Sequence, residues 1–245
     1  MTRDEQPFDG RFWISHVLWP AFGFVFALSL IGILDLDRRI SHAFYYDAVS
    51  NHWLGNEGGL WARDFIHTGG RWLVRSLATV AIIVWIATFC SRRLASWRRA
   101  AGYAVIALAL SAGIVGGLKA VSNVDCPWDL AEFGGDRPYV GLFSERPESL
   151  PHAACFPGAH AASGFALVCG YFLFRDRSKR KAAMALGLAV LVGVAFSFGQ
   201  EARGAHFLSH DLTSAAIVWF VQLLLYALIL APRYAEIPQM RVVRI

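Results

Sequence analysis

Long apolar runs, separated by short polar stretches, follow one another along most of the chain. A run of roughly 20 apolar residues can cross a bilayer as an α-helix, and a helix satisfies its own backbone hydrogen bonds in lipid. The pattern therefore predicts an all-α membrane protein, a bundle of six transmembrane helices. The predicted spans are Phe12–Leu34, Trp72–Cys90, Ala101–Val121, Gly158–Phe174, Ala182–Gln200 and Ser209–Ala231.

The composition agrees with a membrane protein. Of the 245 residues, 56% are hydrophobic and only 17% are charged, whereas an average soluble domain has about 25% charged residues. The length suits one compact bundle. Residues 1–245 are therefore predicted to form a single membrane domain without a second one.

Basic residues concentrate in two short segments between predicted spans. Ser91–Arg99 follows the second span and Arg175–Lys181 follows the fourth. The positive-inside rule places both segments in the cytoplasm, and six spans then place both termini there as well. The C-terminal tail agrees, since it carries Arg233, Arg241 and Arg244. The formal net charge of +5 thus indicates membrane topology rather than a nucleic-acid partner.

The opposite membrane face receives the segments Asp35–Arg71, Ser122–Pro157 and Glu201–Leu208. Ionisable groups gather where these segments meet the predicted helix ends. Such groups are rare at membrane depth and usually functional, so their presence on one face predicts a site. They are Lys119, His160, Arg203, His206, His210 and Asp211.

Lysine, arginine and paired histidines suit phosphoryl transfer. The transition state of that reaction spreads negative charge over phosphoryl oxygens, which fixed cations stabilise. One histidine can attack phosphorus, and another can protonate the leaving oxygen. The main-chain N–H groups at the start of a helix bind anions, and here Gly158 and Ala159 supply them.

Three short motifs in this region resemble those of the type-2 phosphatidic acid phosphatase superfamily, membrane lipid phosphatases that share an active-site plan with vanadium haloperoxidases. The family patterns are K-x6-RP, PSGH and SR-x5-H-x3-D. Lys119 matches the lysine, but Cys126 stands where the first arginine is expected. Arg137, in the following loop, is a candidate to replace it. The sequence PGAH, Pro157–His160, corresponds to PSGH.

The third motif diverges most from the family pattern. His206 aligns with the nucleophile, but Arg203 lies three residues before it and Gln200 stands at the arginine position. His210 occupies the place of the aspartate that orients the nucleophile, and Asp211 is its neighbour. Neutral His210 or ionised Asp211 can each accept a hydrogen bond from His206, so the sequence leaves both open.

The resemblance implies a metal-independent lipid phosphatase with a haloperoxidase-like core and no cofactor. His206 would attack the phosphate to form a phosphohistidine, and His160 would protonate the lipid oxygen. Lys119 and Arg203 would hold the phosphoryl oxygens. The expected substrate is a phosphate or pyrophosphate on a membrane lipid, such as lipid A, phosphatidylglycerophosphate or undecaprenyl pyrophosphate. The site would face the periplasm from a bacterial inner membrane.

Other functions fit the same residues. A phosphotransferase would pass the phosphate from the phosphohistidine to a second lipid instead of to water. A zinc-dependent hydrolase would use His206 and His210, which lie four residues apart on one helix face, with His160 or Asp211 as a further ligand. A transporter or accessory bundle would need none of this chemistry, although the chain lacks the paired interrupted helices that mark inverted repeats.

Cysteines in the second outer segment predict a covalent link. Cys126 and Cys155 both lie in this segment, and an oxidising compartment favours a disulfide between them. Such a bond would join the first motif to the second. Cys90 and Cys169 lie in or near spans and are expected to act as small apolar residues.

Residues 61–75 combine helical spacing with tryptophans and arginines. This combination predicts an interfacial helix that leads into the second span. Arg71 and Arg75 lie one turn apart in it. We expect them to hold lipid phosphates or a neighbouring acid, with a substrate headgroup as the alternative.

Overall fold

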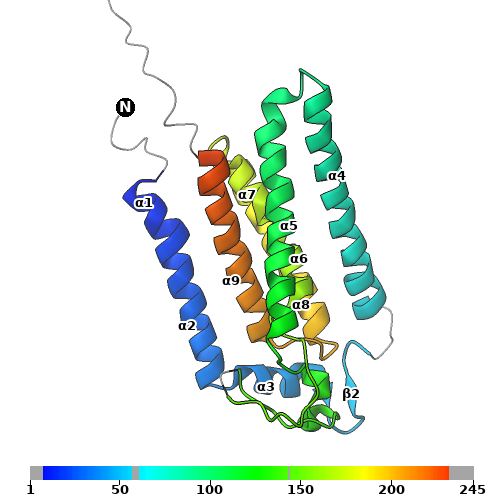
Figure 1. The fold of residues 1–245 in the computed structure, drawn as a ribbon. Helices are drawn as coiled ribbons and strands as arrows, with labels where there is room; N and C mark the ends of the chain where they lie inside the picture. The colour runs from blue at the N-terminus through cyan, green and yellow to red at the C-terminus, as the bar shows by residue number, and fades with distance from the viewer. Residues whose placement is uncertain (1–7, 57–60, 143, 232–245) are drawn as a thin grey trace, which may run out of the picture.

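The computed structural model describes residues 8–56, 61–142 and 144–231, which form a bundle of long helices closed at one end by loops and short elements (Figure 1). Among these residues, five helices are long and apolar enough to cross a membrane. They are Gly10–Ile33, Trp61–Cys90, Ala95–Val121, Lys179–Glu201 and Leu208–Leu230.

The outer surface of the bundle is apolar, as expected for a protein whose solvent is lipid. Helix α4, Gly70–Cys90, shows this clearly, because Val80, Ile83 and Ile86 are each more than half exposed. Soluble monomers rarely expose continuous apolar surfaces of this extent. The chain is therefore an integral membrane protein, and the prediction from hydropathy is confirmed.

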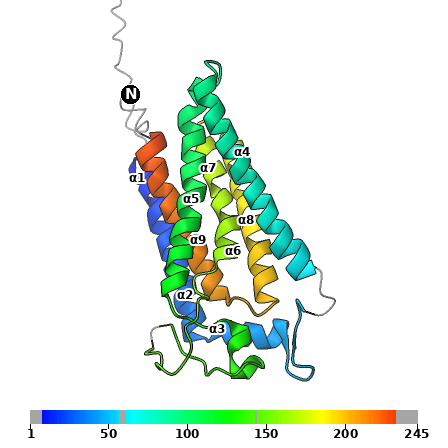
Figure 2. The same cartoon turned by 45° about the vertical axis from the view of Figure 1, so that its right-hand side comes forward.

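The predicted fourth span is a shorter helix inside the bundle. Its parts are α6 (Ala159–Phe165), the 3₁₀ turn η8 (Ala166–Val168) and α7 (Cys169–Phe174). It packs against three longer helices, α5 (Arg98–Val121), α8 (Lys179–Glu201) and α9 (Leu208–Leu225) (Figure 2). Glycines allow this close approach, since a methyl group on Gly164 would lie 2.9 Å from the Cα atom of Gly193. Because this helix is short, the number of six spans stays a prediction.

Several spans begin or end in wider, π-helical turns. The first helix runs through α1 (Gly10–Trp13), η2 (Ile14–Leu18) and α2 (Trp19–Ile33). The other turns are η4 (Trp61–Gly69) before α4 and η9 (Tyr226–Leu230) after α9, and a 3₁₀ turn, η5 (Ala95–Trp97), precedes α5. The helix predicted at the membrane interface is therefore the first part of the second span, with which it is continuous.

One end of the bundle, here called the loop end, consists of residues 34–56, 122–142, 144–158 and 202–207. Its short elements are α3 (Leu36–Ile40), η3 (Ser41–Tyr45), β1 (Tyr46–Asp47), β2 (His52–Trp53), η6 (Pro127–Asp129) and η7 (Ala131–Phe133). Strands β1 and β2 pair antiparallel. A buried, largely aromatic cluster joins the loop segments; its members are Tyr46, Trp53, Leu130, Phe133 and Phe207.

The two cysteines predicted to pair form a disulfide at the loop end. The Cα atoms of Cys126 and Cys155 lie 5.2 Å apart. The bond connects the chain just after α5 to the chain just before α6. Cys90 is an exposed free thiol, and Cys169 is a buried one.

The basic segments lie at the opposite end of the bundle. Residues 91–97 connect α4 to α5 there, and residues 175–178 connect α7 to α8, beside the start of α1 and the end of α9 (Figure 1). Positive charge and both ends of the described chain thus share one side, as the topology prediction requires. Which side faces the cytoplasm stays a prediction. The tail residues Arg233, Arg241 and Arg244 lie outside the described residues.

Candidate active site

His206 and Asp211 form a buried pair where α8 connects to α9. His206 Nδ1 lies 2.6 Å from Asp211 Oδ1, and the two residues are 5% and 2% exposed. In the state with Asp211 ionised, its carboxylate only accepts hydrogen bonds, so His206 Nδ1 carries the proton and donates it. The other ring nitrogen, Nε2, then holds a free electron pair. Asp211, rather than His210, occupies the position that orients the His206 ring.

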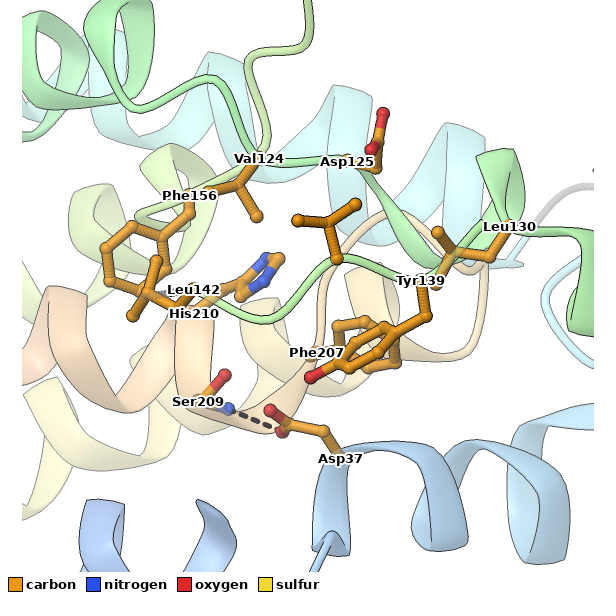
Figure 3. Close-up of a pocket in the computed structure, with 11 residues that line it drawn as sticks. Asp37, Val124, Asp125, Leu130, Tyr139, Leu142, Phe156, Phe207, Ser209 and His210 are labelled. Carbon is orange, nitrogen blue, oxygen red and sulfur yellow. Dashed lines mark hydrogen bonds between the residues drawn. The ribbon is translucent and has the colours of Figure 1, made fainter. Parts of the chain in front are cut away.

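The local fold brings this pair into place. Gly204 has a φ of +71°, a left-handed conformation that glycine adopts easily, and ends the turn after α8. Asp37 of α3 then accepts a hydrogen bond from the Ser209 N–H in the first turn of α9 at 2.9 Å (Figure 3). A carboxylate at this position satisfies a free amide and complements the helix dipole. The start of α9, and with it Asp211, is fixed from the loop end.

His210, the other candidate to orient His206, lies outside the hydrogen bond between His206 and Asp211. Its ring centre lies 6.3 Å from that of His206. It borders a small pocket of about 50 Å³ beneath the loop end, which Asp37, Tyr139 and Phe207 also line (Figure 3). His210 therefore contributes to packing between α9 and the outer loop.

Lys119, at the end of α5, reaches the same region. Its ammonium group donates to the Cys155 carbonyl at 3.1 Å. Burial, followed by the nearby charges of Lys119 and Arg203, lowers the pKa of His206 from its ordinary value of 6.5 to about 3. The His206 ring therefore stays neutral at physiological pH, which is the form with a nucleophilic nitrogen.

His160 lies in the first turn of α6. Its ring stacks on Phe196 of α8 with centres 4.4 Å apart, and the centre of the His67 ring lies 4.7 Å away. His160 Nε2 is buried and has no hydrogen-bond partner among the described residues. A buried nitrogen without a partner is costly, so this atom is available to a group that enters the site.

Gly158 brings the start of α6 against the His206–Asp211 pair. Its N–H donates to the His210 carbonyl at 3.1 Å, so this amide is already engaged and differs from the free anion donor that the sequence predicts. A Cβ atom on Gly158 would lie 1.9 Å from Asp211 Oδ1 and 2.8 Å from His206 Nδ1. Position 158 therefore tolerates only glycine without displacing the pair. Ala159 follows as the first residue of α6.

Arg203 lies at the edge of this group. Its Nη1 donates to Gln200 Oε1 at 3.2 Å, and its guanidinium lies over the Trp128 ring at 5.9 Å. Gln200 also contacts His67, with 2.7 Å between Gln200 Nε2 and His67 Nδ1. Sequence reasoning did not assign His67 or Gln200 to the site. The only signal was a histidine within the helical pattern of residues 61–75, which gave no indication of its distant neighbours.

Arg137 is engaged elsewhere. It forms ion pairs with Asp125 at 2.6 Å and Asp129 at 3.8 Å, and Arg146 also pairs with Asp125. Burial favours a raised pKa for Asp125, but hydrogen bonds and charges from Arg146 and Arg137 bring it below its ordinary value. The role of Arg137 as a substitute for the missing arginine finds no support, because its guanidinium neutralises a buried acid of the loop.

The zinc alternative lacks a ligand set in the part of the chain that the structure describes. No group of three or more histidine, cysteine or acidic side chains there is arranged to hold a metal ion. Asp211 contacts His206 through Nδ1 and leaves His210 outside that contact. The described residues instead present a nucleophilic imidazole beside two fixed cations.

Comparisons with known proteins bear on the family and the fold of the chain. Residues 100–233, more than half of the chain, match the family described as the PAP2 superfamily. No curated protein sequence matches the chain. A solved structure with a similar fold is the transmembrane PAP2-type phosphatidylglycerolphosphate phosphatase from Bacillus subtilis, with a TM-score of 0.51 and 17% sequence identity. The alignment covers 92% of this chain and 99% of that protein.

Proposed function

Because this chain belongs to the PAP2 superfamily, as its motifs predict, we propose that it hydrolyses a phosphate or pyrophosphate group on a membrane lipid. The family and the membrane bundle support a lipid phosphatase. The proposed mechanism uses a phosphohistidine and no metal. We place the site at the periplasmic face of a bacterial inner membrane, because the basic segments lie at the opposite end of the bundle.

In the first step, His206 Nε2 attacks the phosphorus atom. The new N–P bond forms as the P–O bond to the lipid breaks. His160 enters this step protonated at both ring nitrogens and delivers its Nε2 proton to the departing oxygen. In the second step, water attacks phosphorus, the N–P bond breaks and His160 takes the proton from the water. Inorganic phosphate leaves, and both histidines return to their starting states.

The remaining groups stabilise charge during these steps. Asp211 keeps the proton on His206 Nδ1 and stabilises the positive ring that forms when Nε2 bonds to phosphorus. Lys119 and Arg203 are close enough for their charges to act on His206, and fixed cations at that distance stabilise the phosphoryl oxygens of the transition state.

The observation that carries the proposal is the His206–Asp211 pair, held at 2.6 Å beside Lys119 and Arg203. Nothing in this geometry requires a dication. Neither the family nor the geometry selects one lipid. The named neighbour acts on phosphatidylglycerolphosphate, which makes that lipid the first substrate to test, together with lipid A and undecaprenyl pyrophosphate.

The test is incubation of the purified protein in lipid bilayers with labelled lipid phosphates. We expect free phosphate, inhibition by vanadate and no loss of activity with chelators. His206→Ala should abolish turnover, and Asp211→Asn should lower it by about 10²–10⁴-fold, far more than His210→Phe. A newly phosphorylated lipid without free phosphate would identify a phosphotransferase. Activity that chelators abolish, or that His206→Ala retains, would refute the mechanism.

A further inference from the structure

A hydrogen-bonded chain runs from Arg203 through Gln200 to His67. Arg203 Nη1 donates to Gln200 Oε1 at 3.2 Å, and Gln200 Nε2 lies 2.7 Å from His67 Nδ1. Gln200 is 3% exposed. These hydrogen bonds connect the loop after α8 with η4, two segments more than 130 residues apart in sequence.

These two hydrogen bonds determine which nitrogen of the His67 ring carries the proton. An arginine only donates, so the Gln200 atom facing Arg203 is the carbonyl oxygen and the atom facing His67 is the amide nitrogen. That nitrogen also only donates, so His67 Nδ1 accepts. A neutral imidazole that accepts at Nδ1 carries its proton at Nε2. His67 therefore presents an Nε2–H donor on the side of the ring opposite Gln200.

His67 lies among the residues of the proposed mechanism. Its ring centre is 4.7 Å from that of His160, and the charge of Arg203 acts on it. The contact with Gln200 uses only Nδ1. Arg203, Gln200 and His67 thus form one rigid edge of the site, with His67 contributing its second nitrogen.

Resting on the function proposed above, we propose that His67 is a phosphoryl-binding residue and Gln200 its positioning residue. His67 Nε2–H donates to a non-bridging phosphoryl oxygen, whose negative charge is present in the substrate and in the transition state. A donor held in advance at a fixed angle avoids reorganisation during the reaction. Gln200 acts through His67 and Arg203 without touching the substrate.

Two substitutions of His67 separate this role from a structural one. The amide nitrogen of glutamine can approach the position of a histidine Nε2, whereas the oxygen of asparagine can approach that of Nδ1. His67→Gln should therefore keep a donor for the phosphoryl group, while His67→Asn should keep only the acceptor for Gln200. We expect kcat/KM to fall by about 10²-fold in His67→Asn, to recover in part in His67→Gln, and vanadate inhibition to weaken in the same order.

The reverse order, with His67→Asn active and His67→Gln impaired, would show that His67 only supports Gln200 and would overturn the proposal. Equal and unchanged kinetics in both variants would overturn it as well. His152→Asn, in an exposed position of the outer loop, is the matched control and should retain wild-type kinetics.

Gln200→Leu tests the positioning role by a spectroscopic signature. Nitrogen NMR of the histidine rings should show His67 protonated at Nε2 in the wild type, with His67→Asn identifying its signals. The variant should show a mixture of the two tautomers and a smaller loss of kcat/KM than His67→Asn. An unchanged tautomer in Gln200→Leu would overturn this part of the proposal.

These outcomes are distinct from failure of the proposed function. If the wild type releases no phosphate from any lipid and His206→Ala changes nothing, the function itself is wrong. If the wild type is active and His206→Ala inactive while the His67 variants behave as wild type, only the assignment of His67 and Gln200 fails.

Discussion

Single residues decide the chemistry at the loop end through their protonation and their size. In the proposed mechanism, His206 acts only as a neutral ring whose Nδ1 is bound, and Asp211 supplies that contact. Gly158 is useful only because it lacks a side chain, since its backbone lies against both members of the pair. A change of pH tests the protonation of His206, and an added methyl group tests the size of residue 158.

The buried His206 ring should make the folded protein sensitive to acid. Its pKa is about 3 in the folded protein and ordinarily 6.5, so the unfolded chain binds a proton first as the pH falls. The contribution of His206 to stability is therefore complete above pH 6.5 and is lost progressively between about pH 6.5 and 3. Thermal unfolding in detergent between pH 7 and 4 should show a larger loss for the wild type than for His206→Asn. Parallel curves would exclude this assignment.

Gly158→Ala should inactivate the enzyme while leaving it folded. The added methyl group would lie 1.9 Å from Asp211 Oδ1, so the pair must move apart. Overpacking of this kind typically costs about 1–3 kcal/mol, which a bundle of this size survives. Phosphate release should fall by at least about 10²-fold, because a displaced nucleophile loses its alignment. Gly187→Ala is the control, since its added methyl group meets no atom within 4 Å; equal activity in both variants would contradict the argument.

At the scale of elements, the position of α9 depends on a contact from a distant short helix. Asp37 of α3 binds the Ser209 N–H in the first turn of α9 (Figure 3). Asp37→Ala should cost about 0.5–2 kcal/mol, the usual effect of losing a cap, and should lower activity because Asp211 lies in the same turn. A thermal melt and a phosphate-release assay measure the two effects. Asp47→Ala, which removes a carboxylate from the exposed β1–β2 turn, should affect neither.

Hydropathy was sufficient to locate the helices, because a span in lipid needs a continuous apolar run whatever its neighbours are. Hydropathy did not establish whether Ala159–Phe174 crosses the membrane. This helix lies inside the bundle and is shorter than the five candidate spans. The motifs located His206, His160 and Lys119. Spacing could not choose between His210 and Asp211, since consecutive residues at a helix start differ in direction by about 100°.

Residues that meet only in the folded chain were beyond prediction. His67 contacts Gln200 at a sequence separation of 133, and no local pattern encodes such a pairing. The ion pairs of Arg137 were beyond prediction for a related reason. The sequence showed a free basic residue near the site, whereas its neutralisation by Asp125 depends on how the loop folds.

For the molecule as a whole, the disulfide connects the two helix ends that carry Lys119 and His160. It joins residues 29 apart, and closing a loop of that length stabilises a folded chain by about 3–4 kcal/mol in the chain-entropy description. The Cys155 carbonyl also accepts from Lys119, so its position bears on the site. The bond therefore supports stability and activity together.

Reduction should lower both the melting temperature and the rate of phosphate release of the wild type. The measurement is a melt and an assay with and without a thiol reductant in the same bilayer preparation. A double variant, Cys126→Ser with Cys155→Ser, should already be impaired and should not respond to the reductant. An equal response of the double variant would show that the reductant does not act through this disulfide.

The helix Trp61–Cys90 has a consequence for the setting in which the protein works. Its α-helical part, α4, has 21 residues and measures about 32 Å, close to the thickness of about 30 Å of the hydrocarbon core of a bilayer. Such a helix meets thinner or thicker membranes by changing its tilt, and His67 lies near its end. The acyl-chain length of the host lipids is therefore expected to shift the geometry of the site, so that hydrophobic mismatch becomes one of the variables that set the catalytic rate.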